Sequence, residues 1–338
     1  MSRTSATKPL PERSPGLRYR IPFWAFLGLV STAFAEVLFP NTPFSPVAMA
    51  GIAFPVYFLH SVFLAGVVFR SGRVSFSSLY LAGVLFGLYE AYVTKVVWDP
   101  VGDPIPIQVA GLYPFEGLSL VLFWHPIMAF VIPVTVVELV ATKSNRSVGP
   151  PLAGHAYASH LAVVAGASLS VFHGVLGEGP VTTLISTVST LVVLFAVLWG
   201  WRRAGGHRFA MGQLLPRGRE LRVLGVLLLG LYVIYGVALR PEALPERPLP
   251  HLLVLSTYAV VGGALLLSLR RPEAGDPSTD VSFSWRRVLA VAGAFVTATG
   301  AAGLFLTPLG TGVFLSYFVV GPTVGLACIV FVVRRLRR

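Results

Sequence analysis

Glu90 is the residue of this chain whose type and setting point most directly to chemistry. It lies in the stretch GLYEAYVTKVVWDP, residues 87–100, which begins as a segment apolar enough to dissolve in lipid. An ionisable group in hydrocarbon is costly, so by default it marks a functional position. A carboxylate there could carry a proton, bind a ligand or act as a counter-ion. We expect Lys95 to anchor the outer end of this helix, by snorkelling or by pairing with Asp99 one turn on.

Three further titratable residues lie at a similar depth in other apolar segments. They are His125, His173 and Glu36. Counting about 1.5 Å per residue places these side chains and Glu90 about 5 to 9 Å outward from the middle of their segments. Four groups at one depth, on four helices, could converge on a single outward-side site for a substrate or a proton. Glu36 could instead reach the outer headgroups.

The same residues are weak candidates for a metal site. Glu90, His125 and His173 could bind Zn²⁺ or Fe²⁺ through one carboxylate and two imidazoles. The HExxH and HxxxH spacings that would place two ligands on one helix face are absent from the sequence. The one cysteine, Cys328, lies in the apolar run GLACIVFVV, where a buried inert thiol is expected. The sequence identifies no cofactor.

Small residues share a helix face with two of the candidates. A spacing of four, three and four residues places one set on a common face, namely Gly83, Gly87, Glu90 and Thr94. The same spacing recurs in Gly166, Ser170, His173 and Gly177. A GxxxG step permits close approach of helices in lipid. Both candidates therefore lie on faces suited to packing, where a polar side chain can find a partner.

Prolines interrupt two of the apolar segments. Pro55, Pro126 and Pro133 lie well inside them, and Pro126 directly follows His125 in LFWHPIMAF. Each proline removes a backbone donor and tends to kink its helix. Broken helices at mid-membrane are a feature of transporter binding sites, but prolines also kink helices that bind nothing. Both interpretations remain open here.

The longest loop on the outer side, residues 99–117, contributes three acids, Asp99, Asp103 and Glu116. Aromatic residues flank it, which is typical of an aromatic belt with solvated acids at the interface. The alternative is a lid over the predicted site that concentrates cations by its charge.

Three other ionisable residues of the first half are not assigned to the predicted site. Glu138 and His160 fall near the inner interface. His60 lies deeper, but the sequence shows no companion at its level.

The composition of the chain indicates that membrane-spanning helices position these residues. The 338-residue chain is 55% hydrophobic and only 12% charged, with a mean hydropathy of +0.76, and each membrane span needs about 20 apolar residues. Ten apolar segments can be marked, at 21–39, 46–69, 76–98, 118–141, 158–177, 180–201, 222–239, 251–269, 287–307 and 311–333. The predicted fold is all-α, a polytopic transmembrane helix bundle of about ten spans.

The basic residues fix the predicted direction of the spans. With the N-terminus in the cytoplasm, all of the 26 Lys and Arg residues fall on that side except Lys95, Arg240 and Arg247. The positive-inside rule therefore places both termini in the cytoplasm, in a protein of the cell membrane. Because the net charge of +12 is spread over alternating loops, it indicates orientation and not nucleic-acid binding.

The chain divides into a short tail and one membrane domain. Residues 1–20 are predicted to be a disordered basic tail in the cytoplasm, and 21–338 a single transmembrane helical domain. Within it the first half, 21–177, is polar and the second, 180–333, is apolar, since the presumed spans from residue 182 to 333 contain no Asp, Glu, Lys or Arg.

Three functions are compatible with these patterns. The first is a secondary transporter of a small solute. In this case Glu90 and a histidine could couple transport to protons. The second is an integral-membrane enzyme acting on a lipid or lipid-linked substrate at the outer leaflet, with acid–base or metal chemistry from Glu90, His125 and His173. The third is a non-catalytic membrane subunit. The lipid bilayer is the expected environment, and oligomeric state is not predicted.

Overall fold

The fold is known from a computed structural model that describes residues 15–37, 49–71, 74–100, 107–143, 180–271, 283–305 and 310–337. Six helices in this part of the chain are long and apolar enough to cross a membrane: Gly51–Arg70, Pro114–Ala141, Val181–Arg203, Arg219–Ala238, Pro248–Arg270 and Val319–Arg337. An apolar run favours helices because a helix satisfies its own backbone polar groups in lipid. The expected span at 158–177 lies outside the described residues.

The helices of the first half contain several π-helical stretches. In chain order they are α1 (Leu17–Thr32), the π-helix η1 (Ala33–Val37), the π-helix η2 (Met49–Ala53), α3 (Phe54–Arg70), α4 (Phe76–Gly87), α5 (Tyr89–Tyr92), α6 (Pro114–Glu116), the π-helix η3 (Gly117–Val131) and α7 (Ile132–Ala141).

The helices of the second half are long and mostly uninterrupted. They are α9 (Pro180–Arg203), the 3₁₀ turn η5 (Gly206–Arg208), α10 (Met211–Leu214), α11 (Arg219–Ala238), the 3₁₀ turn η6 (Pro241–Ala243), α12 (Pro248–Arg270), α13 (Trp285–Phe305) and α14 (Gly310–Arg337).

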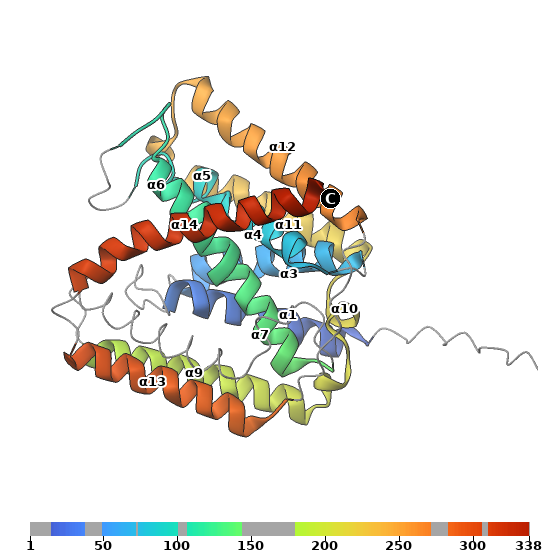
Figure 1. The fold of residues 1–338 in the computed structure, drawn as a ribbon. Helices are drawn as coiled ribbons and strands as arrows, with labels where there is room; N and C mark the ends of the chain where they lie inside the picture. Colours follow the sequence, from blue (N-terminus) through green and yellow to red (C-terminus); the bar gives the residue numbers. More distant parts are fainter. Residues whose placement is uncertain are drawn as a thin grey trace, which may run out of the picture.

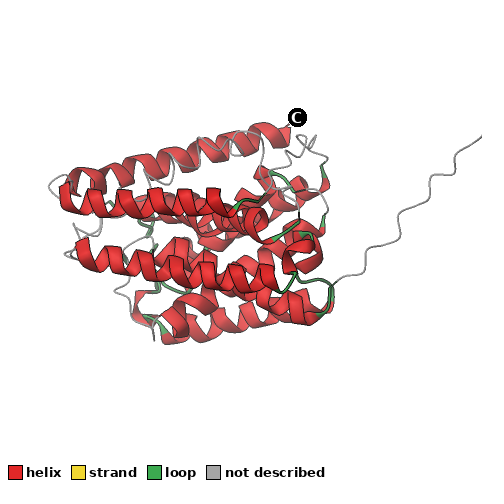
Figure 2. Cartoon of the chain, turned by 90° about the horizontal axis from the view of Figure 1, so that it is seen from below, coloured by secondary structure: helices red, strands yellow, loops and turns green. Residues whose placement is uncertain are grey.

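The polar half forms the centre of the bundle and the apolar half its periphery. Figure 1 shows α1, α3, α4 and α7 between the α9–α13 pair on one side and α12 with α14 on the other. Figure 2 shows the long helices running side by side. Phe23, Leu79 and Phe130 in the central helices are fully buried, whereas Val226 of α11 and Val260 of α12 are 68% and 70% exposed. Such outward apolar faces are what lipid tails require.

One central helix connects three parts of the bundle. The hydroxyl oxygen of Tyr80, on α4, lies 2.7 Å from the carbonyl oxygen of Leu122 on η3 and 2.9 Å from that of Gly325 on α14, so its one hydrogen is shared between the two carbonyls. Tyr80 is fully buried, so both hydrogen bonds are shielded from competition by water. They hold an outer helix of the apolar half against the core.

The basic chain segments meet at one end of the bundle. Arg20, at the start of α1, forms an ion pair with Glu220 and donates to the carbonyl of Leu215 at 2.7 Å. The backbone N–H of Lys143 donates to the carbonyl of Phe209 at 3.0 Å. The segments that the sequence assigns to one side of the membrane are thus in contact with one another.

The predicted span at 76–98 is wrong in its outer part. The helix is interrupted at Leu88, resumes as α5 and ends at Tyr92, and residues 93–99 continue as a turn. This turn stays buried, with Val93 fully covered and Trp98 only 4% exposed. Irregular backbone is tolerated at such depth only where protein covers it, as here.

Candidate functional site

Glu90 occupies a short helical turn just beyond the interruption of its helix. It lies on α5, one turn after Gly87, and is 6% exposed. The Thr94 hydroxyl, four residues on, donates to Oε2 of Glu90. The carboxylate is therefore held inside the protein and kept from lipid, as a polar group in a membrane requires.

Two glycines bring a second helix within reach of Glu90. A Cβ added to Gly83 would lie 2.5 Å from the Cα of Pro126, and one added to Gly87 would lie 3.1 Å from the Cβ of His125. Because both positions lack a side chain, α4 and η3 approach closely enough for His125 to reach Glu90. The distance from Oε1 of Glu90 to Nε2 of His125 is 3.1 Å.

The hydrogen bonds of His125 determine where protons can sit. Its Nδ1 lies 3.0 Å from the carbonyl oxygen of Leu120, five residues earlier on η3. A carbonyl only accepts, so Nδ1 carries a hydrogen. The contact between Nε2 and Glu90 then needs one more proton, either on the imidazole or on the carboxyl group. Glu90 and His125 thus form a pair that can share a single proton.

Two tyrosines connect this pair to Glu36. The Tyr89 hydroxyl lies 3.0 Å from Nε2 of His125 and 3.3 Å from the Tyr57 hydroxyl. Tyr57 in turn donates to Oε1 of Glu36 at 2.6 Å. We call Glu36, Tyr57, Tyr89, Glu90 and His125 the carboxylate–imidazole chain. Hydrogen bonds run through it without a gap from one carboxylate to the other.

Two members of the carboxylate–imidazole chain lie on π-helical backbone. Glu36 lies on η1, and His125 lies on η3, where Pro126 has no N–H to donate. A π-helical turn leaves side chains in positions that a regular α-helix does not reach, and such turns are frequent at functional sites. The prolines Pro55 and Pro133 lie at the first turn of α3 and α7, directly after π-helical stretches.

A second polar cluster, around His60, lies beside the carboxylate–imidazole chain. His60 is 2% exposed, its ring stacks on Phe86 at 4.6 Å between centroids, and its Nδ1 lies 2.8 Å from the carbonyl oxygen of Val56. Its Nε2 lies 3.2 Å from the Tyr232 hydroxyl, which lies 3.2 Å from that of Tyr258. The sequence showed no companion for His60. The structure supplies one from α11, in the apolar half.

Lys95 does not snorkel and does not pair with Asp99, which corrects the expectation from sequence. It is fully buried, and its ammonium donates to the carbonyls of Gly236, at 2.8 Å, and Leu239, at the end of α11. Asp99 forms its ion pair with Arg240. A lysine here satisfies carbonyls that the end of a helix leaves without intrahelical partners.

The remaining sequence candidates have separate positions. His173, His160 and Asp103 lie outside the described residues. Glu116 is half-buried on α6, and no contact links it to the carboxylate–imidazole chain among the hydrogen bonds of the described residues. Glu138 is 2% exposed in the last turn of α7, so it is buried in protein. Within the described ranges, no three His, Cys, Asp or Glu residues are grouped so that they could hold a metal ion.

Sequence reasoning missed the two tyrosines that complete the chain. Tyr57 and Tyr89 lie in apolar runs, where an aromatic residue is the ordinary choice for packing. The available signal was the phenol itself, because a buried tyrosine hydroxyl usually needs a hydrogen-bond partner. That signal names no partner, since the partners come from other helices.

Comparison with known proteins places the chain in a family. Residues 25–338 match an uncharacterized membrane protein family, and the chain belongs to that family. It is 35% identical over 227 residues to an uncharacterized protein of Archaeoglobus fulgidus, a match that covers 64% of this chain and 69% of that protein. No solved structure matches it.

Proposed function

We propose that this member of an uncharacterized membrane protein family is a secondary transporter of a small solute, coupled to protons through Glu90 and His125. The observation that carries the proposal is the 3.1 Å contact between Glu90 Oε1 and His125 Nε2, inside a bundle of apolar helices. Chains of acids and histidines buried in membrane proteins are typical of proton relays in pumps and transporters.

The pair is suited to hold and release one proton. With a proton between them, Glu90 and His125 are either a neutral acid beside a neutral imidazole or a compensated ion pair. Loss of that proton leaves an uncompensated buried carboxylate, which is costly in a low-dielectric interior. A conformational change that opens the site to water would lower this cost. Proton release is thereby linked to the shape of the protein.

The tyrosines provide a route for the proton between the pair and Glu36. Hydroxyl groups can accept a proton on one side while donating on the other. Tyr57 and Tyr89 are both buried, so the route excludes bulk water along its length. Glu36 is half-buried and would be the exchange point with the solvent.

The backbone around the site is suited to movement. The helix carrying Glu90 is interrupted at Leu88 and ends at Tyr92, and Lys95 adopts a left-handed φ of 64°. Discontinuous helices near the middle of the membrane are where transporters bind solutes and ions. We propose that the solute binds in this region. The loop at 99–117 would then act as an outer lid over the site.

The proposed topology has about ten spans, with both termini in the cytoplasm of a cell-membrane protein. It is supported by the contacts among the basic segments at one end, including Arg20 with Glu220 and the Lys143 backbone with Phe209. Excess Lys and Arg mark the cytoplasmic side. His173, on the fifth proposed span, remains a candidate for the same site.

An integral-membrane enzyme is the second candidate. The observation that favours it is that the acids and the imidazole of the carboxylate–imidazole chain all lie in the first half, on η1, α5 and η3. A carrier with matched halves need not be so asymmetric. Glu90 and His125 would then act as general acid and base on a lipid-linked substrate.

The test uses proteoliposomes with a pH-sensitive dye trapped inside. Solutes of different charge classes are added under an imposed proton gradient, and solute-dependent proton flux is recorded for wild type, Glu90→Gln and Glu242→Gln. Glu242 is an exposed carboxylate on η6 and serves as the matched control. We expect Glu90→Gln to abolish the flux and Glu242→Gln to preserve it.

Two results would contradict the proposal. Normal flux with unchanged pH dependence in Glu90→Gln removes the coupling role of this residue. A lipid product that forms in wild-type vesicles, and is lost in Glu90→Gln without any solute-driven flux in wild type, would favour the enzyme.

A further inference from the structure

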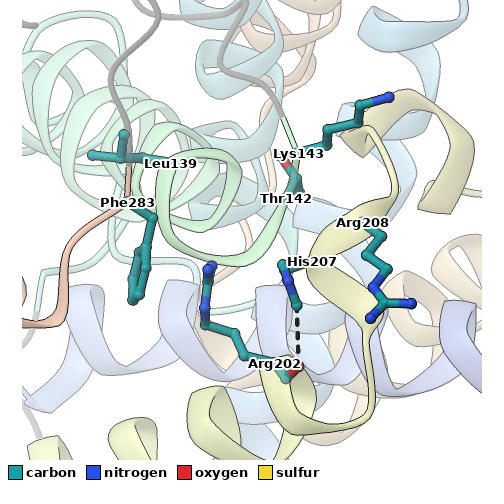
Figure 3. Close-up of a pocket in the computed structure, with 7 residues that line it drawn as sticks. All are labelled: Leu139, Thr142, Lys143, Arg202, His207, Arg208 and Phe283. Atoms are coloured by element: carbon teal, nitrogen blue, oxygen red, sulfur yellow. Dashed lines mark hydrogen bonds between the residues drawn. The ribbon is translucent and has the colours of Figure 1, made fainter.

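A pocket of about 510 Å³ lies at the basic end of the bundle, away from the carboxylate–imidazole chain. Its lining comes from the end of α7, the end of α9, the η5 turn and the segment before α13: Leu139, Thr142, Lys143, Arg202, His207, Arg208 and Phe283. Figure 3 shows Arg202 rising from α9 toward α7, with the ring of Phe283 on one side and His207 on the other. We call it the basic pocket.

The charge of the basic pocket selects an anion. It contains three permanent cations, Lys143, Arg202 and Arg208, and none of the described residues that line it is acidic. The Thr142 hydroxyl, at the lining, already donates to the carbonyl of Glu138 at 2.7 Å. Arginine presents several N–H donors in a plane and suits phosphate oxygens particularly well.

Arg202 is held in position before any ligand binds. One of its N–H groups donates to the carbonyl of Val140 at 2.6 Å, and its guanidinium lies 3.5 Å from the centre of the Phe283 ring. His207 is fixed to the same residue, with its Nδ1 3.0 Å from the carbonyl oxygen of Arg202. A pre-positioned cation loses little side-chain entropy when it binds an anion.

An apolar groove of about 490 Å³ lies next to this pocket. It lies between α9 and α13 and is lined by Phe195, Ala196, Trp199, Trp285 and Leu289. Phe195, Trp199 and Arg202 are four and three residues apart on α9, so they share a face. On the other wall, Phe283 of the pocket contacts Trp285 of the groove, with ring centroids 5.2 Å apart.

We propose that the basic pocket and this groove together bind one anionic phospholipid, with the phosphate at the cations of the pocket and an acyl chain along α9 and α13. The pocket lies at the ends of two helices that qualify as membrane spans, which is the level of lipid headgroups. Basic pockets between membrane helices are known to take anionic headgroups. The groove supplies the apolar surface that a free phosphate would not need.

The test measures lipid binding to the purified full-length protein by native mass spectrometry. Phosphatidylglycerol is titrated against phosphatidylcholine and inorganic phosphate, using wild type, Arg208→Gln, the double variant Arg202→Gln/Arg208→Gln, and Arg222→Gln. Arg222 is an exposed arginine on α11 at the same end of the bundle and serves as the control. Size-exclusion chromatography checks that each variant remains folded.

We expect phosphatidylglycerol to bind in preference to phosphatidylcholine. At about 1 kcal/mol per basic residue, its affinity should fall about fivefold in Arg208→Gln and about thirtyfold in the double variant, and stay within about twofold in Arg222→Gln. Arg208 is exposed, so its variant remains informative if the double variant does not fold.

Three outcomes would overturn the proposal. Equal binding of phosphatidylcholine would remove the role of charge. Unchanged affinity of Arg208→Gln for phosphatidylglycerol would show that the lipid does not bind in the basic pocket. Inorganic phosphate binding as tightly as the lipid, and surviving a Trp285→Ala change in the groove, would show a site for a free anion and no acyl-chain contact.

Discussion

Oε1 of Glu90 lies 3.1 Å from Nε2 of His125, although the two residues are on separate helices and 35 positions apart in the chain. A double-mutant cycle measures this relationship. Glu90→Met and His125→Phe each leave one buried polar partner unsatisfied, so both should destabilise the protein. The double variant replaces both partners by apolar groups, and we expect it to recover about 1 to 3 kcal/mol of the summed loss. Unfolding in mixed detergent micelles provides the free energies.

The comparison for this cycle pairs Glu90→Met with Glu242→Gln. These sites share no contact among the described residues, so their effects should add within about 0.5 kcal/mol. Additivity of the Glu90 and His125 variants themselves would show that the two side chains do not interact.

Removal of the Tyr57 hydroxyl should interrupt the route between Glu36 and the pair. Tyr57→Phe keeps the ring, which packs against Phe86 at 5.4 Å between centroids, and removes the hydroxyl that joins Glu36 to Tyr89 and His125. If proton transfer passes through this hydroxyl, solute-driven proton flux should fall at least about tenfold. Tyr235→Phe is the control, because that hydroxyl donates to the carbonyl of Gly51 and is not part of the carboxylate–imidazole chain. Equal flux in the two variants would place the proton route elsewhere.

A methyl group at Gly83 should destabilise the central helix pair. The added Cβ would lie 2.5 Å from the Cα of Pro126, so the backbone of η3 must shift. We expect Gly83→Ala to cost about 1 to 3 kcal/mol, as overpacking of a core does. Gly262, on α12, has no atom within 4 Å of such a Cβ, and alanine there should be neutral or stabilising. The melting temperatures of the two variants in detergent decide the point; a Gly83→Ala protein as stable as Gly262→Ala would contradict it.

Lys95 should contribute to stability as a cap for α11. Lys95→Met keeps the length of the side chain but leaves the carbonyls of Gly236 and Leu239 without the ammonium. Hydrogen bonds from charged groups contribute more than neutral ones, and we expect a loss of about 2 kcal/mol. Arg247→Met, an exposed cation on the same side of the bundle, should have no measurable effect. Equal melting temperatures for both variants would indicate that Lys95 is dispensable.

His207 should report on the charge of the basic pocket. Burial lowers its pKa below the ordinary value of 6.5, and the positive charge of Arg202 lowers it further. Since the unfolded chain binds this proton more readily, the contribution of His207 to stability is lost as pH falls below 6.5. In the folded protein, Arg202→Gln or bound phosphatidylglycerol should raise the pKa, whereas Arg222→Gln should not. Titration of the imidazole by NMR tests each change; a pKa insensitive to Arg202→Gln would refute the assigned cause.

The amino-acid sequence was sufficient to predict the helical membrane character of this protein and several members of the candidate site. A long apolar run allows only structures that satisfy their own backbone, so most of the helices could be located without a structure. Glu90 and His125 stood out because titratable groups are costly in hydrocarbon, and the glycines before Glu90 indicated a face for close packing. These inferences depend on local composition and on the helical period alone.

Which of these groups are in contact depends on how the helices pack against one another. Tyr57 and Tyr89 could not be assigned from sequence, because the partners of a buried phenol come from other helices. Lys95 was misplaced for the same reason: its helix ends at Tyr92, and the carbonyls that its ammonium reaches belong to α11. The basic residues were known to share one side, but a pocket forms only because the ends of α7 and α9 and the η5 turn are packed together. Contacts between distant parts of a chain depend on how its helices pack, and helical periodicity carries no information about that.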